Sequence, residues 1–511
     1  SASGERPERS HNLRALARPG METDDVEHPI TYSPPMTRKC NPPLNVERRQ
    51  LMQKIAGGAA IALGAPAIAI AQDFGSKTDV LFLEPGQAQF ETHRVLYNKR
   101  IAGTPRVIAL CLDESGVVRA VRRAINEGLQ IAIKSGGHSF EGFSMNDGGM
   151  VIDLSPMNRL ALAADYSLRA GPGCRLSEVY DCVLPRGRLL PAGTCGGVGL
   201  AGLTLGGGYG LFSRKLGLTC DSLKRVRLVD GDGEVHDSID TPELLWACRG
   251  GGTGGLGIVT QFQYVTHAAP KVLHSFRYRY RIGTAQDALS LASHWASVAR
   301  ELPAEAYSAF VANSKTITIL VTTFSSSTRD PRISKALALL AGNASKVEEP
   351  KSEPLGIGIG RYSGQKGPLF FKNASGGFYN GVEDMGSAAI AIFQSVLEQR
   401  GIIFQINTFG PLPPVPESAF PHRAFAFIGE LQAYWDKPSA AKRALDTIAR
   451  LQGALTAAGV QAHYANYPDL NLGNWTHAYY GEKNYVRLQA LKAQYDPADV
   501  FRHAQSIRLR I

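Results

Sequence analysis

The sequence predicts an α+β fold built from two globular domains. With 511 residues, of which 44% are hydrophobic and 20% charged, the chain is long enough to bury two cores. Up to about residue 265, short apolar strands alternate with amphipathic helices. From about residue 270, longer amphipathic strands and helices follow. These two patterns of strands and helices predict an α+β first domain and a second domain in which helices cover a sheet.

The first 71 residues differ from the rest in composition. Residues 1–35 are polar and aperiodic, which predicts disorder or sequence upstream of a true start at Met36. Residues 36–71 carry Arg48 and Arg49, followed by a weakly apolar run that is shorter and richer in Gly and Ala than a membrane span of about 20 residues. We expect a cleaved twin-arginine signal, a periplasmic or secreted protein, and no stable membrane insertion after cleavage. The alternative is an Ala-rich soluble helix.

The first domain is expected to span residues 72–268. Its helices and strands are expected, in order, in "DESGVVRAVRRAINEG" (helix), residues 129–133 (strand), "GGMVIDLS" (strand), "LSEVYDCVLP" (short helix ending at its proline) and "VRLVDGDGEVH" (hairpin turning at Asp-Gly).

The second domain is expected to span residues 269–458. The stretches "VLHSFRYRYRI" and "TITILVTTFSSS" are typical of amphipathic strands, and "AQDALSLASHWASVARE" and "GSAAIAIFQSVLEQRG" of helices. Residues 459–511 are crowded with Trp and Tyr, so we expect this segment to pack back on the first domain.

Charge and cysteine spacing exclude two function classes. The formal net charge is +10, but basic and acidic residues are interspersed without a Lys/Arg run, so nucleic-acid binding is not expected. The seven cysteines include no C-x-x-C pair, so neither a zinc ribbon nor a dithiol motif is predicted, and we expect no metal site.

Two glycine-rich runs point to a nucleotide cofactor. The run from Gly193 to Gly210 has too many glycines for the interior of a stable helix or strand, and it permits close backbone approach to phosphate oxygens. The second run contains G-x-G-x-x-G from Gly252 to Gly257. A helix-like stretch precedes it and a strand follows it, the reverse of the Rossmann order, so a Rossmann fold is rejected.

Several ordered motifs resemble those of the berberine bridge enzyme-like oxidases of the vanillyl-alcohol oxidase superfamily. The motifs are "KSGGHS" at 134–139, the cysteine and glycine loop at 195–210, "ELLWACRGGGTGGLGIVT", "FPHR" at 420–423, "NYPDL" at 466–470 and "YDPADVFRHAQSI". The resemblance covers residues 76–511. It implies a PCMH-type FAD-binding domain of two α/β subdomains, a substrate domain with an antiparallel sheet covered by helices, and a C-terminal berberine-bridge-like segment.

The resemblance implies that FAD is attached covalently through His138. The chemistry is reasonable because a neutral imidazole nitrogen can add to an oxidised flavin quinone methide. A core histidine with satisfied hydrogen bonds is the alternative. Cys195 matches members that carry a second bond, from the sulfur to flavin C6. Gly196 replaces the usual proline and Leu203 the usual histidine, so a buried thiol remains the alternative there.

The same resemblance places further residues near the cofactor, with backbone amides serving the pyrophosphate. These residues are Lys134, Ser135, Gly136, Gly137, Ser139, Val198, Gly199, Gly202, Gly207, Gly208, Gly257, Ile258, Val259 and Asn466.

Two residues are candidates for the catalytic base. Tyr467 matches the tyrosine of "NYxDL" in sugar oxidases and cannabinoid synthases, and a phenol with a pKa near 10 would need a cation or the electron-poor flavin to stabilise its phenolate. A merely stacking or hydrogen-bonding role is the alternative. Glu430 is the nearest match to a glutamate that serves some relatives. A register uncertainty of one residue decides whether it faces substrate or solvent.

The function implied is an FAD-dependent oxidase that takes a hydride from an alcohol or hemiacetal carbon to flavin N5 and reduces O2 to H2O2. A sugar or oligosaccharide is the favoured small-molecule substrate. The alternatives are an amine or alkaloid oxidase, a dehydrogenase of the same fold, and a flavin-binding protein without turnover.

Overall fold

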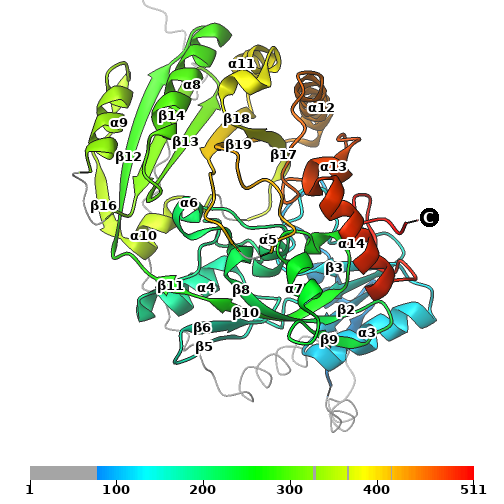
Figure 1. Cartoon of the computed structure of the whole chain (residues 1–511). Helices are drawn as coiled ribbons and strands as arrows, with labels where there is room; N and C mark the ends of the chain where they lie inside the picture. Colours follow the sequence, from blue (N-terminus) through cyan, green and yellow to red (C-terminus); the bar gives the residue numbers. More distant parts are fainter. Residues whose placement is uncertain (1–77, 326–329, 365–366, 416, 511) are drawn as a thin grey trace, which may run out of the picture. The chain divides into compact units, whose positions relative to one another are not determined.

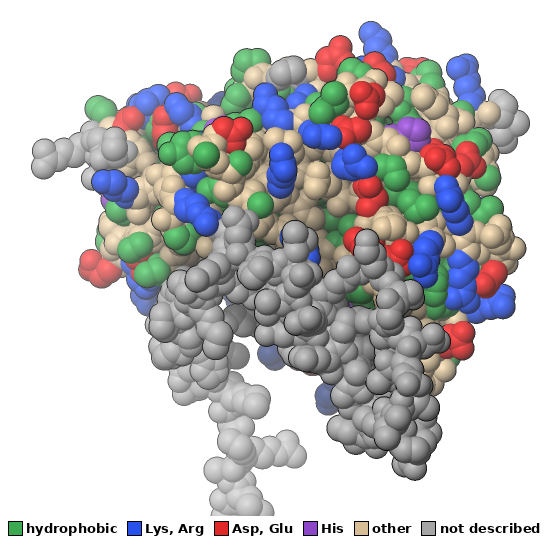
Figure 2. Space-filling view, turned by 90° about the horizontal axis from the view of Figure 1, so that it is seen from below, with side chains coloured by type: hydrophobic (Ala, Val, Ile, Leu, Met, Phe, Trp, Pro, Cys, Tyr) green, Lys and Arg blue, Asp and Glu red, His purple; other side chains and the backbone are tan. Residues whose placement is uncertain are grey.

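The computed structural model describes residues 78–325, 330–364, 367–415 and 417–510. The predicted leader, residues 1–35, and the predicted export signal, residues 36–71, lie outside the described residues. Among the helices that the structure describes, none has the length and apolarity needed to cross a membrane. On the face seen in Figure 2, Lys and Arg side chains alternate with Asp and Glu, so no patch of a single sign covers the coloured part of that face.

A four-stranded sheet opens the first domain. Its elements are β1 (Val80–Leu83), α2 (Ala88–His93), β2 (Val107–Cys111), α3 (Glu114–Asn126), β3 (Ile131–Lys134) and β4 (Met150–Asp153). The strand order is β1-β2-β4-β3, with β1 antiparallel to β2 and the other pairs parallel. The apolar runs of β2 and β4 are buried throughout, as expected of parallel strands, and α3 shares a core with them.

A five-stranded antiparallel sheet follows, in the order β5-β6-β10-β8-β9. Its strands are β5 (Leu160–Leu162), β6 (Ser167–Ala170), β8 (Leu223–Val229), β9 (Val235–Asp237) and β10 (Ile258–Val265), with β7 (Arg188–Leu189) and β11 (His267–Ala268) pairing separately. The helices and turns around it are α4 (Leu176–Val183), η1 (Leu184–Arg186), α5 (Leu200–Leu205), α6 (Ser213–Leu216), η2 (Thr219–Ser222), α7 (Pro242–Cys248) and η3 (Gly252–Gly254). β8 and β9 form the predicted hairpin.

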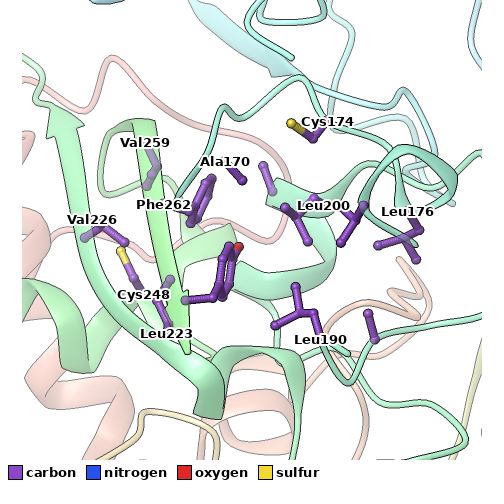
Figure 3. Close-up of a cluster of buried hydrophobic side chains, with 14 of the residues drawn as sticks. Ala170, Cys174, Leu176, Leu190, Leu200, Leu223, Val226, Cys248, Val259 and Phe262 are labelled. Atoms are coloured by element: carbon purple, nitrogen blue, oxygen red, sulfur yellow. The ribbon is translucent and has the colours of Figure 1, made fainter. Parts of the chain in front are cut away.

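The core beside this sheet supports the first glycine run. Figure 3 shows Phe262 and Val226 of the sheet in the same apolar cluster as Leu200 at the start of α5. The six residues of α5, "LAGLTL", form a helix inside a run that was expected to form none, because Gly202 is the only glycine among them and its leucines reach the core or its edge.

The second domain is built on an eight-stranded antiparallel sheet. The order is β15-β12-β14-β13-β18-β19-β17, and β16 also pairs with β12. The strands are β12 (Val272–Arg281), β13 (Ala306–Asn313), β14 (Thr316–Thr323), β15 (Lys346–Val347), β16 (Lys351–Pro354), β17 (Phe370–Tyr379), β18 (Ile402–Thr408) and β19 (Phe427–Trp435). The helices and turns are α8 (Ala285–Arg300), α9 (Pro331–Ala341), α10 (Leu355–Gly360), η4 (Val382–Met385), α11 (Ala388–Glu398), η5 (Pro438–Ala440) and α12 (Ala441–Ala457).

The two faces of this sheet differ in chemistry. α8, α9, α11 and α12 cover one face (Figure 1), and the alternate residues Phe404, Ile406 and Leu431 pack under them. Gln405 lies between Phe404 and Ile406, and Glu430 precedes Leu431. Because side chains alternate along a strand, Gln405 and Glu430 project from the other face of the sheet. The α+β fold with a helix-covered antiparallel sheet is confirmed.

The C-terminal segment carries α13 (Trp475–Tyr480) and α14 (Glu482–Tyr495). Lys492 of α14 is fully buried, pairs with Asp496, and donates to the carbonyls of Gly255 (2.9 Å) and Phe501 (2.7 Å). Phe501 bridges to Ile131 of β3. The segment thus contacts both the first sheet and the second glycine run.

Candidate active site

The loop after β3 approaches the first glycine run at backbone contact distance. A Cβ atom at Gly136 would lie 2.4 Å from the amide nitrogen of Gly199 and 2.6 Å from its Cα. A Cβ at Gly199 would in turn lie 2.5 Å from the nitrogen of Gly136 and 2.7 Å from the Ser135 hydroxyl. Gly137 adopts a φ of +68°, in the left-handed region. The glycines of "KSGGHS" therefore allow this loop to lie against the glycine run.

Gly136→Ala tests this contact. Because the added methyl would meet backbone, which cannot rotate away, the free energy of unfolding should fall by about 1–3 kcal/mol and less flavin should be bound. Gly453→Ala is the control: Gly453 lies in α12 with open space around its Cβ position, so alanine should raise the free energy of unfolding by about 0.4–1 kcal/mol. Thermal denaturation and flavin absorbance measure both effects. Equal stability of the two variants would contradict the contact.

His138 lies between Tyr97 and the first glycine run. Its ring stacks on Tyr97 at a centroid distance of 3.9 Å, and a Cβ at Gly197 would lie 3.3 Å from its Nε2. Burial, with a smaller contribution from Arg175, lowers the pKa of His138 to about 4. The imidazole is therefore neutral at physiological pH, the form with a free nitrogen lone pair.

Cys195 begins the turn that contacts His138. The turn is closed by the amide of Val198, which donates to the Cys195 carbonyl at 3.1 Å. The residue is exposed, yet the surrounding protein desolvates the thiol and, with Glu430, raises its pKa to about 11. Cys195 also contributes, after burial, to the raised pKa of Tyr97, the residue that stacks on His138. The imidazole and the thiol therefore border one region of the molecule.

Other predicted cofactor residues contribute backbone or packing. The Lys134 ammonium pairs with Asp153 at 2.9 Å, and His93 binds the same carboxylate oxygen at 2.9 Å. Although burial opposes it, the hydrogen bond from His93 and the charge of Lys134 lower the pKa of Asp153 to about 2. The lysine thus anchors the end of β3, and the hydroxyl of Ser139 accepts the Phe143 amide at 3.0 Å inside the loop.

The remaining glycines divide between the two runs. Gly207 and Gly208 have φ values of +123° and +83°, and Gly208 donates its amide to the Tyr464 hydroxyl at 2.9 Å. Asn466 donates to the Leu203 carbonyl at 3.0 Å, so its side chain is used to hold the glycine run. Gly202 has open space around its Cβ position.

The second glycine run, from Gly252 to Gly257, differs from the first because the residues that follow it pack into the protein core. Ile258 and Val259 are buried in two cores, and a Cβ at Gly257 would lie 2.5 Å from a Leu228 methyl carbon. Their side chains are therefore directed at the protein interior, which leaves only backbone groups of this run for a cofactor.

Tyr467 is held by three aromatic neighbours. Its ring stacks on Phe140 (5.3 Å, 12°) and contacts Tyr464 edge-on (5.1 Å). Its hydroxyl lies 2.8 Å from that of Tyr209. Burial first, and then the charge of Glu430, raise the pKa of Tyr467 well above its usual range. The charge that acts on Tyr467 is thus a carboxylate rather than a cation, and it opposes phenolate formation. Of the two stabilising groups expected from the sequence, the flavin is the one that remains.

Glu430 lies on the polar face of β19. Its neighbour Leu431 is in the helix-covered core, which fixes the register that the sequence left open. Its Oε1 accepts from Asn373 Nδ2 at 3.2 Å. Burial raises the pKa of Glu430 to about 7, with hydrogen bonds from Gln432 and Asn373 acting in the opposite direction. The carboxyl group therefore titrates in the range that suits a general base.

A polar network around Tyr467 and Glu430 was not predicted from the sequence. Asn407 donates to the Tyr209 hydroxyl at 3.2 Å, and its Oδ1 accepts from Tyr307 (2.5 Å) and Gln405 (2.7 Å). The charge of Glu430 contributes to the raised pKa of both Tyr209 and Tyr307. The alternation of Gln405 and Asn407 with isoleucine and phenylalanine in "IIFQINT" is the signal that would have indicated a polar sheet face.

The residues present fit a covalently held flavin. A neutral imidazole and an accessible thiol border one region, and glycine backbones that approach closely beside it can present amides to a pyrophosphate. Residues 105–238 match the FAD binding domain model, and residues 463–508 match the model described as berberine and berberine like. The chain therefore carries the FAD binding domain and the berberine-like domain of berberine bridge enzyme-like FAD-linked oxidases.

Relatives of this berberine bridge enzyme-like protein extend over most of its length. It is 29% identical over 427 residues to an FAD-linked oxidoreductase of Bacillus subtilis, covering 81% of this chain and 93% of the relative. It is 28% identical over 458 residues to chitooligosaccharide oxidase of Gibberella zeae, covering 83% and 91%. The chain is an FAD-linked oxidoreductase.

Solved structures agree in fold. The BBE-like 1 protein of Physcomitrella patens has a TM-score of 0.76 and 26% identity, covering 84% of this chain and 97% of the other. A chitooligosaccharide oxidase structure has a TM-score of 0.75 and 25% identity, covering 84% and 98%. The PCMH-type FAD-binding architecture is thereby confirmed.

Proposed function

We propose that this chain is an oxidase that removes hydrogen from a hydroxyl-bearing or hemiacetal carbon of a sugar or oligosaccharide, with Glu430 as the base. The observation that carries the proposal is a buried carboxyl with a pKa of about 7 on a polar sheet face beside Tyr467. Bound FAD would accept the hydride at N5 and pass the electrons to O2, giving H2O2.

Glu430 suits the base role better than Tyr467. A carboxylate with a pKa of about 7 is ionised in half of the molecules at neutral pH and accepts a hydroxyl proton without prior activation. Tyr467 stays protonated, because burial and the negative charge of Glu430 both oppose its ionisation. In this proposal the Tyr467 hydroxyl orients substrate or Tyr209, and the proton moves to the carboxylate of Glu430.

Attachment of FAD through His138, and through Cys195 as well, is part of the proposal. The neutral imidazole of His138 is the form that its bond requires, and the Cys195 sulfur is accessible. Because its pKa is raised to about 11, Cys195 is a thiol that must lose its proton when the second bond forms. Lys134, paired with Asp153, would hold the attachment loop at the end of β3.

The polar face favours a polyhydroxylated substrate. Gln405, Asn407, Asn373 and Tyr307 make this face polar, and the hydrogen bonds among them and to Glu430 hold it in place. Asn373 Oδ1 is buried without a hydrogen-bond partner, so a ligand hydroxyl that donates to it would be selected over an apolar group. The chitooligosaccharide oxidase relative supports the same class. An amine oxidase is the second candidate, since an ionised Glu430 would also attract an ammonium group.

Anaerobic reduction of the purified protein tests the substrate class. Chito- and gluco-oligosaccharides should bleach the flavin absorbance, and readmitted air should restore it with formation of H2O2. Bleaching by amines alone would select the second candidate. Bleaching by oligosaccharides without reoxidation by O2 would indicate a dehydrogenase.

Export through the twin-arginine route is the proposed localisation, based on the sequence of residues 36–71. Fused to a reporter that is active only after export in the folded state, residues 36–72 should direct export, and Arg48→Lys with Arg49→Lys should stop it. Export that survives this double change would point to another route or to a misread helix.

A further inference from the structure

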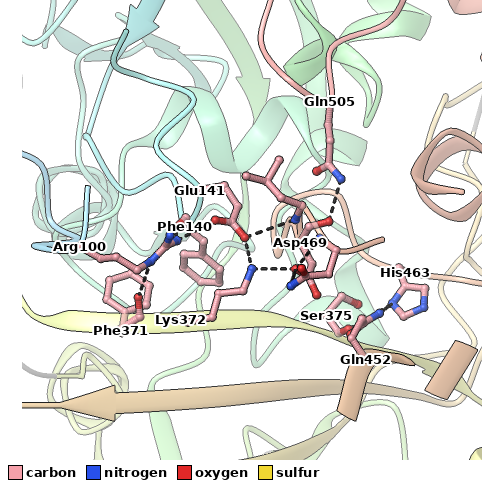
Figure 4. Close-up of polar contacts among 12 residues, drawn as sticks. Arg100, Phe140, Glu141, Phe371, Lys372, Ser375, Gln452, His463, Asp469 and Gln505 are labelled. Atoms are coloured by element: carbon pink, nitrogen blue, oxygen red, sulfur yellow. Dashed lines mark hydrogen bonds and ion pairs between the residues drawn. The ribbon is translucent and has the colours of Figure 1, made fainter. Parts of the chain in front are cut away.

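Four charged side chains form a chain of ion pairs between the two domains and the C-terminal segment. In the ionic cluster of Arg100, Glu141, Lys372 and Asp469, cations and anions alternate (Figure 4). The side chains of Glu141, Lys372 and Asp469 are 2%, 4% and 1% exposed, and that of Arg100 is 20% exposed. Three of the four charges are therefore held almost entirely away from water.

Lys372 is the centre of the ionic cluster. Its ammonium pairs with Glu141 Oε1 and, at 2.7 Å, with Asp469 Oδ1. Arg100 closes the other end, pairing with Glu141 Oε2 at 2.7 Å and donating to the Phe140 carbonyl at 2.9 Å. Asp469 Oδ2 is buried with no hydrogen-bond partner, and in the described part of the chain Lys372 is the only cation paired with Asp469. Lys372 alone thus balances the charge of Asp469.

Three members of the ionic cluster lie within three residues of the active site in the sequence. Glu141 follows His138 by three residues, and Asp469 follows Tyr467 by two. Lys372 precedes Asn373, which donates to Glu430. Glu141 also accepts the amide of Leu470 at 3.4 Å, which ties the His138 loop to the Tyr467 segment.

Stability alone is a weak reason for such a cluster. Buried ion pairs recover little more than the cost of desolvating their charges, and apolar replacements of similar shape are often as stable. What the ion pairs do supply is a fixed spacing, because moving one loop would strand a buried charge. Phe140, which precedes Glu141, stacks on Tyr467, so this stack lies directly beside the ionic cluster.

We propose that Lys372 is a positioning residue, which holds the His138 loop and the Tyr467 segment in register by balancing the charges of Glu141 and Asp469. This inference rests on the proposed function in that the register aligns the cofactor with Glu430 and Tyr467. The position itself is measurable without substrate, through the visible circular dichroism of bound flavin.

The change Lys372→Met gives a pH-dependent signature. Without the ammonium, Arg100 still pairs with Glu141, but Asp469 is left as a buried carboxylate beside Glu141 with no paired cation in the described part of the chain. Proton uptake by Asp469 relieves this repulsion. The other titratable groups facing the ionic cluster are Tyr479 and His463. Burial raises the pKa of Tyr479 and lowers the pKa of His463, so in both residues it favours the neutral form. The variant should therefore approach wild type as the pH falls.

The test compares flavin circular dichroism and the anaerobic reduction rate at pH 5.5 and pH 8. For Lys372→Met we expect an altered flavin spectrum and a rate at least tenfold below wild type at pH 8, with recovery of the spectrum at pH 5.5. Lys372→Met with Asp469→Asn removes the repulsion and should stay within about threefold of wild type at pH 8. Lys442→Met, which breaks an exposed ion pair with Asp446, is the control and should change neither readout.

The outcomes separate this inference from the proposed function. A wild-type flavin spectrum in Lys372→Met at both pH values would overturn the inference, even if the melting temperature fell. If Lys372→Met does not fold, the double variant decides: a rate more than tenfold below wild type at pH 8 overturns the inference. If sugars fail to bleach wild-type flavin while the spectral change and its recovery persist, the proposed function fails and the positioning role stands.

Discussion

Glu430→Gln is expected to slow anaerobic flavin reduction by a factor of about 10² to 10⁴, the usual loss when a general base is removed. Glutamine keeps the shape of the side chain, and its carbonyl oxygen can still accept the hydrogen bond from Asn373, so the site should remain packed. The flavin spectrum and the melting temperature should therefore stay close to wild type. Stopped-flow absorbance after anaerobic mixing with an oligosaccharide measures the rate.

Tyr467→Phe is the matched comparison. It removes one hydroxyl that contacts Tyr209 and leaves the stack on Phe140 intact. A single hydrogen bond contributes about 1 kcal/mol, so the reduction rate should fall by roughly fivefold. If Tyr467→Phe slowed reduction by more than a hundredfold while Glu430→Gln left it unaltered, the base would be Tyr467.

The double variant His138→Ala with Cys195→Ala is expected to lose covalent flavin completely. Each single variant should retain flavin after acid precipitation, because the remaining residue still forms its bond. Cys248→Ala, which changes a buried free thiol in the core, is the control and should retain flavin like wild type. The measurement is flavin absorbance in the pellet and the supernatant.

Two results would revise the attachment. Free FAD in the supernatant of acid-precipitated wild type would show that neither bond forms. Complete release from His138→Ala alone would mean a single link, with Cys195 an unmodified thiol.

The sequence predicted the architecture because its signals were local. Each of these signals lies within a short stretch of sequence. They are the apolar runs of the parallel strands, the Asp-Gly hairpin between β8 and β9, and the different patterns of strands and helices in the two domains. The motifs of the flavin site were also readable, since close backbone approach restricts such positions to glycine, as at Gly136 and Gly199.

The chemistry of the site was harder to predict because it depends on distant contacts. Tyr209 meets Asn407 and Tyr467 across 198 and 258 residues of sequence, and no local pattern indicates such meetings. The sheet face on which Glu430 lies could be assigned only from the pairing of β19 with β17 and β18. The ionisation expected of Tyr467 depended on a cation or on the flavin, and only the folded chain reveals that the nearby charge is the carboxylate of Glu430.

The most direct test of Glu430 as the base is the pH dependence of anaerobic flavin reduction in wild type. A carboxyl whose pKa is raised to about 7 is protonated, and so inactive as a base, below that pH. If Glu430 is the base, the rate should rise about tenfold per pH unit below 7, level off above it, and lose this dependence in Glu430→Gln. A rate that is independent of pH between 5 and 9, or that rises only near the pKa of a tyrosine, would contradict it.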